Sequence, residues 1–380
     1  MKANPEGTKT RLAYLDNVRS LVIFLVVAMH SAVTYSGIGG WYYKEGALEE
    51  LSIFEMVFFA FGQSFLQAWF MGILFFVSAY FASKALAKRG PLGFIKERLF
   101  RLGLPLLLYV FIISPFIEFV LLGVNPENNF FENYILVITN FWWLDDTGPL
   151  WFVEALLLFC LVYAFFKRIF PKRVEIQNVG TKNIIRTIIV TGIIAFLIRL
   201  VFPIDTSFCN LQFCYFASYI VMFIAGVLIG ENNLLEKIAD EKNVKWIRIS
   251  LVIGLPIWFF IVIFGGVLEG IYYFKGGFYW QSFAYALWEA LTAIGFSIGL
   301  IAFFRKKVNI ANKFSCLMKD NAFGIYCFHA PILVSISVLL RHLVLMPILK
   351  FAVVLIITFA ACLVFSFLVR KIKPIGALFK

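Results

Sequence analysis

Long apolar segments separated by short polar connectors dominate this sequence. A bilayer core of about 30 Å needs about 20 apolar residues in a helix. Segments of about this length occur at 15–35, 53–82, 103–123, 148–166, 187–204, 214–230, 248–268, 282–304, 321–340 and 347–369. Only 15% of the residues are charged, against roughly a quarter in a soluble domain. The sequence therefore predicts an all-α, polytopic integral membrane protein with about ten transmembrane helices.

The connectors alternate between basic and non-basic, which predicts the topology. The connectors 84–101, 167–186, 231–247 and 305–320 with their adjoining helix ends, the N-terminus through Arg19 and the tail from Arg370 carry 29 of the 34 Lys and Arg residues. The other five are Lys44, Arg199, Lys275, Arg341 and Lys350. Because Lys and Arg concentrate in cytoplasmic loops, we expect both termini in the cytoplasm. The expected organisation is a cytoplasmic tail at 1–11, a membrane domain at 12–370 and a second cytoplasmic tail at 371–380.

Several other classes of protein are disfavoured. The net charge of +12 is spread over the connectors, where anionic headgroups attract it, rather than gathered into the patch that nucleic acid requires. The polar first ten residues contain no cleavable signal peptide. The six cysteines show no metal-ligand spacing, so no metal site is predicted. Cys209 and Cys214 share one short loop, where they are either free or bridged.

A few polar residues interrupt the apolar segments, and such residues are expensive in hydrocarbon and often functional. They are His30, Glu55, Gln63, Gln67, Glu154, Glu289 and His329. Each has a structural interpretation, in which a hydrogen bond between helices or the headgroup region satisfies it. Together on inward faces they would form a shared polar cavity.

Arg19 and His30 are the most informative pair. They lie eleven residues apart, about three helical turns, so they share one helix face with a rise of roughly 16 Å. Arg19 is expected at the cytoplasmic edge, with His30 directly outward of it. A long anionic molecule that enters from the cytoplasm would meet Arg19 and place its reactive end beside His30, a suitable general base. The alternative is an arginine that snorkels at a helix start and a packed histidine.

A second basic pair opens the third apolar segment. Arg98 and Arg101 are three residues apart and can point together. The planar guanidinium fork suits phosphate, so a phosphate-rich molecule such as coenzyme A would fit. The alternative is ordinary anchoring of a cytoplasmic loop.

These residues together resemble the membrane acyltransferase 3 family. The first helix carries Arg19 and His30 with ten residues between them. The second carries the run Phe75-Phe76-Val77-Ser78-Ala79-Tyr80-Phe81, followed by Arg98 and Arg101. Tyr326-Cys327-Phe328-His329-Ala330-Pro331 and Leu150-Trp151-Phe152-Val153-Glu154 complete the pattern. The resemblance spans about 12–370. One residue departs from the pattern, because Ala79 stands where the family usually has Gly.

The resemblance implies transfer of a small acyl group, acetyl or succinyl, from cytoplasmic acyl-CoA to a carbohydrate hydroxyl at or beyond the outer face of a bacterial cytoplasmic membrane. It is closest to the branch of periplasmic glucan succinyltransferases. The acyl-CoA would be a co-substrate held by Arg19, Arg98, Arg101 and Ser78. His30 would act as base or accept the acyl group itself, Glu154 would orient His30 or the sugar, and His329 would line the same tunnel.

Aromatic and acidic residues near the expected outer mouth suit a sugar, although Trp is common at membrane interfaces without a function. These candidate acceptor residues are Trp142, Trp143, Asp145, Asp146, Trp151, Gln63 and Gln67. The main alternative is a transporter or exporter of a small anion or glycan precursor, against which stands the absence of an internal repeat. A scaffold or sensor without turnover is a third interpretation. The sequence does not indicate an oligomeric state.

Overall fold

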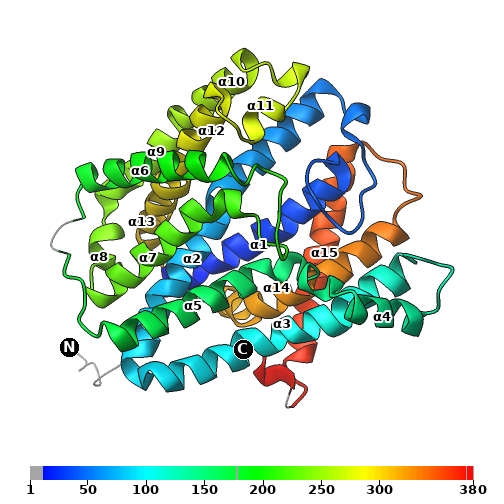
Figure 1. The fold of residues 1–380 in the computed structure, drawn as a ribbon, viewed down its shortest axis with the longest axis horizontal. Helices are drawn as coiled ribbons and strands as arrows, with labels where there is room; N and C mark the ends of the chain where they lie inside the picture. The colour runs from blue at the N-terminus through cyan, green and yellow to red at the C-terminus, as the bar shows by residue number, and fades with distance from the viewer. Residues whose placement is uncertain (1–11, 177–178, 374, 380) are drawn as a thin grey trace.

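The computed structural model describes residues 12–176, 179–373 and 375–379, which form a bundle of helices (Figure 1). The expected tail at 1–11 lies outside the described residues. The principal helices are α1 (Ala13–Ser36), α2 (Ile53–Arg98), α3 (Leu104–Leu108), α4 (Phe130–Thr139), α5 (Trp151–Ile169), α6 (Thr181–Arg199), α7 (Phe216–Glu231), α8 (Leu235–Ile238), α9 (Lys245–Val252), α10 (Gly254–Phe264), α11 (Tyr272–Lys275), α12 (Trp280–Leu291), α13 (Ser297–Lys307), α14 (Lys313–Leu339) and α15 (Pro347–Val369).

Nine helical runs in the described part of the chain are long and apolar enough to cross a membrane. No strand longer than a single bridge occurs there. The prediction of a polytopic helical membrane protein is confirmed. The count is nine rather than ten because one run, Ile53–Leu121, contains both the second and the third predicted segments.

A sharp turn divides that long run. Gly90 has φ 70° and ψ 169°, and Pro91 follows it. Proline lacks an N–H and disfavours helical geometry in the residue before it, while glycine accepts a positive φ. The chain therefore turns at the lower left of Figure 1 and returns through α3. The connector predicted at 84–101 is thus helical on both sides of Gly90.

The returning arm is irregular. Three π-helical turns, η2 (Leu99–Gly103), η3 (Tyr109–Ile113) and η4 (Phe116–Leu121), interrupt it. Such turns are rare and frequent near functional sites. They place Ser114, between η3 and η4, where its hydroxyl group forms hydrogen bonds with Tyr42 and Asp146 of two other segments.

The basic connectors meet at one end of the bundle, which we call the basic end. There Tyr14 N donates to Asn309 Oδ1 (3.3 Å), Lys84 to Asn233 Oδ1 (2.6 Å) and Lys167 to Glu231 (2.9 Å). The non-basic connectors meet at the opposite end, where Lys275 pairs with Asp205 (2.6 Å). This grouping is what the alternation of connectors requires; the cytoplasmic placement of the basic end stays a prediction.

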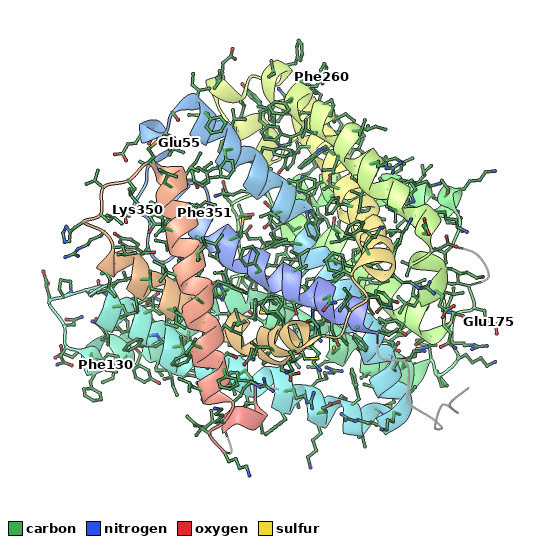
Figure 2. All side chains as sticks on the ribbon, turned by 180° about the vertical axis from the view of Figure 1, so that it is seen from behind. Glu55, Phe130, Glu175, Phe260, Lys350 and Phe351 are labelled. Atoms are coloured by element: carbon green, nitrogen blue, oxygen red, sulfur yellow. The ribbon has the colours of Figure 1, made fainter. Side chains whose placement is uncertain are left out.

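The core of the bundle includes a close approach between α2 and α7. A Cβ on Gly226 of α7 would collide with the carbonyl of Phe76 and stand 2.8 Å from Ala79 Cβ. The methyl group of Ala79, the one departure from the family pattern, thus fits because its neighbour across the interface is glycine. By contrast, α4 lies at the periphery, with Phe130 at the edge of the molecule (Figure 2).

Candidate active site

His30 lies inside the bundle, in the half of α1 nearer the opposite end. Its imidazole is partly buried and densely surrounded by protein. It stacks on the indole of Trp41, with centroids 4.0 Å apart and planes 18° apart. His329 of α14 is a second near-parallel neighbour, at 5.2 Å and 24°. Trp41 and His329 are themselves 6.0 Å apart, so the three rings form one compact cluster of near-parallel rings, which we call the ring stack.

A carbonyl group fixes the tautomer of His329. The side chain is completely buried, and Nδ1 lies 2.6 Å from the carbonyl oxygen of Tyr326. Because a carbonyl oxygen only accepts, Nδ1 must carry the proton, and Nε2 of the neutral ring then carries a lone pair. This Nε2 has no hydrogen-bond partner in the protein. Neither has Nδ1 of His30 or Nε1 of Trp41.

The loop that carries Trp41, residues 37–52, is fastened to two helices. Glu45 N donates to the Thr34 carbonyl of α1 (2.9 Å). The Glu45 carboxylate pairs with Lys350 of α15, whose side chain is only 4% exposed. Lys350 and Glu55 lie near the same end of the molecule (Figure 2). These anchors hold Trp41 over His30.

Tyr42, next to Trp41, begins a polar network. Its hydroxyl lies 2.8 Å from Ser114 Oγ and 3.2 Å from the Tyr109 hydroxyl, and Ser114 donates to Asp146. A Cβ on Gly148, which has φ +47°, would collide with Tyr42 and Tyr109, so only glycine lets the hydroxyls approach so closely. The network links the ring stack to the connector predicted to bind the acceptor.

Burial raises the pKa of Asp146 to about 7, the nearby charge of Glu118 adds to this effect, and the hydrogen bond from Ser114 opposes it. Burial also raises the pKa of Tyr42, and the charge of Asp146 adds to that increase. Asp146 is therefore a carboxyl group that changes charge near neutral pH.

Asp145 and Glu154 lie on the same side as this network. Asp145 Oδ1 accepts from the backbone N–H of Asn210 (3.0 Å). Glu154 bonds the Thr147 side chain and lies near the charge of Asp145. No hydrogen bond or electrostatic interaction joins Glu154 to His30 in the described chain, so the structure does not bring together the pair in which Glu154 would orient His30.

The remaining candidate acceptor residues are dispersed. Trp142 is half exposed, and Trp143 contacts the ring of Phe111 (5.6 Å). Trp151 stacks on Tyr219 (5.5 Å), whose hydroxyl accepts from Gln67 (3.1 Å). Gln63 is buried against the end of α1. Its amide meets Ser36 Oγ at 2.8 Å, which suits a helix cap.

Arg19 lies toward the basic end, as expected. Many protein atoms surround its side chain, although 42% of the side-chain surface is exposed. Its guanidinium group lies 4.0 Å from the carboxylate of Asp16. Between Arg19 and His30 on the same face lie Ile23 and Val26, which are 8% and 2% exposed. The two residues share a face, but packed side chains separate them.

The two arginines of the second basic pair have different immediate partners. Arg98 lies over the ring of Phe94 (4.9 Å), and its Nε has no hydrogen-bond partner. Arg101 is 53% exposed and lies 3.5 Å from Glu97. Each guanidinium group thus contacts a residue one turn earlier in the helix, at positions 94 and 97, which are themselves three residues apart. Ser78 is partly buried in the middle of α2.

A buried ion pair joins α6 to α12. Arg199 and Glu289 are paired, with side chains 0% and 3% exposed, and the guanidinium lies 5.6 Å from the Tyr215 ring and 5.5 Å from the Tyr285 ring. The two charges could be noticed in the sequence as interruptions of apolar segments, but their pairing could not. Nor did the sequence point to Trp41, Tyr42 or Ser114, which carry no motif.

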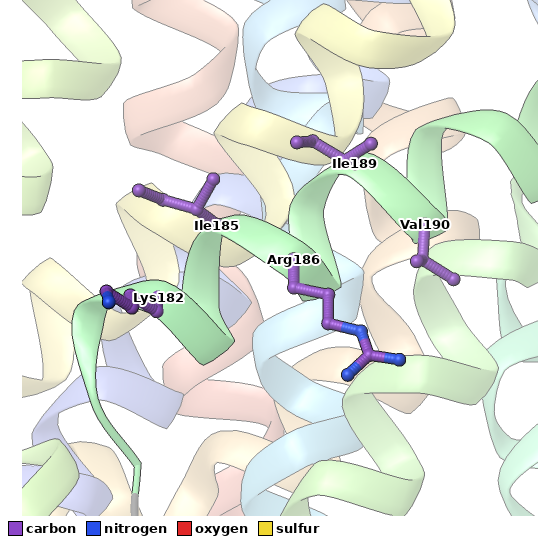
Figure 3. Close-up of a pocket in the computed structure, with 5 residues that line it drawn as sticks. All are labelled: Lys182, Ile185, Arg186, Ile189 and Val190. Atoms are coloured by element: carbon purple, nitrogen blue, oxygen red, sulfur yellow. The ribbon is translucent and has the colours of Figure 1, made fainter.

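None of the six cysteines forms a disulfide, so Cys209 and Cys214 are not bridged. In the described ranges no group of three or more His, Cys, Asp or Glu residues is arranged to hold a metal ion. A shallow hollow on the outer face of α6 is lined mainly by apolar side chains (Figure 3). It lies on a helix with many exposed apolar residues, as lipid contact requires, and contains none of the candidate residues.

A family model described as an acyltransferase domain matches residues 12–367, which is nearly the whole chain. No curated protein and no solved structure matches.

Proposed function

This chain belongs to the membrane acyltransferase 3 family, and we propose that it transfers an acetyl or succinyl group from cytoplasmic acyl-CoA to a carbohydrate hydroxyl at or beyond the outer face of the bacterial cytoplasmic membrane. Membership of the family makes it an O-acyltransferase-type enzyme, and the nine apolar helical runs make it a multi-pass membrane protein. The observation that carries the proposal is an imidazole, His30, held inside the bundle in contact with both Trp41 and His329.

In the proposed reaction His30 removes the proton from the acceptor hydroxyl as its oxygen attacks the thioester carbonyl. A carbon–oxygen bond forms and the carbon–sulfur bond breaks. The proton then passes from the imidazolium to the coenzyme A thiolate, so the cycle needs no external acid. A positioned histidine base contributes typically 10²–10⁴-fold.

The donor would bind at the basic end. Arg19, Arg98 and Arg101 offer guanidinium groups for its phosphates, with Ser78 deeper in α2. Part of the Arg19 side chain is exposed there. Because Ile23 and Val26 are packed between Arg19 and His30, the thioester can reach His30 only if these side chains move.

The acceptor would approach from the opposite end, where Asp145, Asp146, Trp142 and Trp143 lie around the Tyr42 network. Carboxylates and aromatic faces suit a saccharide. The donor and acceptor that we propose to test first are succinyl-CoA and a periplasmic glucan.

The test uses membranes from a strain that lacks the protein, complemented with wild type, His30→Ala or His342→Ala, and incubated with acyl-labelled acyl-CoA. His342 is an exposed histidine in the connector before α15 and serves as the matched control. Label should enter a glycan with wild type and H342A but not with H30A. Label retained by H30A would refute the proposed base, and glycan flux without covalent label would favour a transporter.

A further inference from the structure

His329 presents one ring nitrogen that no protein group uses. Its Nδ1 proton is committed to the Tyr326 carbonyl at 2.6 Å. Its Nε2 is therefore a bare acceptor, enclosed by protein and without a partner. If His329 served only to stabilise α14, the hydrogen bond from Nδ1 would be its whole function.

Two further ring nitrogens in the same stack share this condition, Nδ1 of His30 and Nε1 of Trp41. Buried polar groups in proteins are nearly always paired, and an unpaired one is costly. Three phenylalanine rings would fill the same space without that cost. Three unpaired nitrogens within one stack therefore point to a polar molecule that completes them.

Trp41 is the one ring of the three that a connector carries. Its indole lies 4.0 Å from His30 and 6.0 Å from His329. It therefore covers one face of His30, and its connector lies at the opposite end, from which the acceptor is proposed to approach.

Resting on the acyltransferase activity proposed above, we propose that His329 accepts a hydrogen bond from the acceptor through Nε2, and that the acceptor is a saccharide with two neighbouring hydroxyl groups. His30 takes the proton of the attacking hydroxyl group. His329 accepts a hydrogen bond from the adjacent hydroxyl group, which keeps its proton. The imidazole centroids are 5.2 Å apart with nearly parallel planes, a separation that a pair of adjacent hydroxyls can bridge. An acceptor with a single hydroxyl would leave one imidazole unpaired.

Two amide substitutions separate this role from a structural one. In His329→Asn the side-chain amide reproduces the Nδ1 donor to Tyr326 but has no acceptor at the Nε2 position. In His329→Gln the amide reaches the Nε2 position, where its oxygen can accept, and the Nδ1 donor is lost. His342→Asn is the matched control. Transfer of label from acyl-CoA to glycan is measured for each variant, with its melting temperature in detergent.

We expect H329N to lose at least about ten-fold in transfer, as a site built to bond a substrate hydroxyl loses when one partner is removed. H329Q should keep more transfer than H329N, and H342N should equal wild type. A structural role predicts the reverse order, with H329N active and H329Q impaired. That order, equal losses in both variants, or no loss in either would overturn the proposal. If H30A is inactive while H329N matches wild type, only this inference fails; if H30A transfers label, the proposed base fails, and if wild type transfers none, the proposed function itself fails.

Discussion

The indole of Trp41 lies parallel to the imidazole of His30, with ring centroids 4.0 Å apart. The contact joins the connector 37–52 to α1 and closes one face of the candidate base. In the proposed reaction Trp41 shields this face of His30 from water. Exclusion of water from such a site prevents hydrolysis of a reactive donor.

Removal of this cover should change the fate of the acyl group. With Trp41→Ala, water should reach His30, so thiol release from acyl-CoA should rise several-fold relative to label transferred to glycan. Trp41→Phe keeps a stacking ring and should stay close to wild type in this ratio. Trp280→Ala, at a 48% exposed tryptophan, is the control. An unchanged ratio in W41A would show that Trp41 does not exclude water.

The anchor of the same connector gives a second prediction. Lys350→Met leaves Glu45 without its buried partner, and breaking such a pair costs about 3–5 kcal/mol when both groups are fully buried. Because Glu45 is 23% exposed, we expect about 2 kcal/mol. The freed connector should also be cut faster by trypsin after Lys44, which is exposed. Lys275→Met breaks the more exposed pair with Asp205 and should cost under about 1 kcal/mol. Equal trypsin rates in K350M and wild type would contradict the anchoring role.

The ion pair between Arg199 and Glu289 should behave as a deeply buried one. Glu289→Gln leaves an uncompensated guanidinium with no exposed surface, so we expect a loss of about 3–5 kcal/mol. The double variant Arg199→Met with Glu289→Met removes both charges and should be more stable than either single variant. Thermal unfolding in detergent measures this. A double variant as unstable as E289Q would mean that the pair contributes more to stability than the mutual neutralisation of its two charges.

Sequence reasoning reached the all-helical membrane fold and the approximate positions of the apolar helices, because apolar length is a local property that the bilayer fixes. It also placed Arg19 and His30 on one face of one helix, because the helical period determines which residues share a face. It could not bring His329 to His30, or Arg199 to Glu289, because those contacts depend on how distant helices pack. Trp41 escaped notice because a tryptophan in a connector is typical of any membrane interface.

Local spacing does not determine side-chain partners. Arg98 and Arg101 are three residues apart, and the ring of Phe94 lies beside one guanidinium group while Glu97 lies beside the other. The position of the chain reversal inside the connector 84–101 could not be predicted from charge either, because Gly90 and Pro91 concentrate it in two residues.

Asp146 gives a prediction about pH. Its pKa is raised from 3.8 to about 7, chiefly by burial. A carboxyl group with a raised pKa favours the folded state while it is protonated. Its contribution is complete below pH 3.8 and disappears as the pH rises through 7. Asp146→Asn is neutral throughout and also keeps an oxygen that can accept from Ser114.

The melting temperature of wild type should therefore fall, relative to that of D146N, between about pH 5 and pH 8, by an amount on the order of a few degrees. Asp205→Asn is the control, because Asp205 is 57% exposed and lies in a connector at the same end. Its difference from wild type should not follow the same curve through pH 7. Parallel melting curves for wild type and D146N across this range would show that Asp146 is ionised throughout, and that its hydrogen bond from Ser114 outweighs its burial.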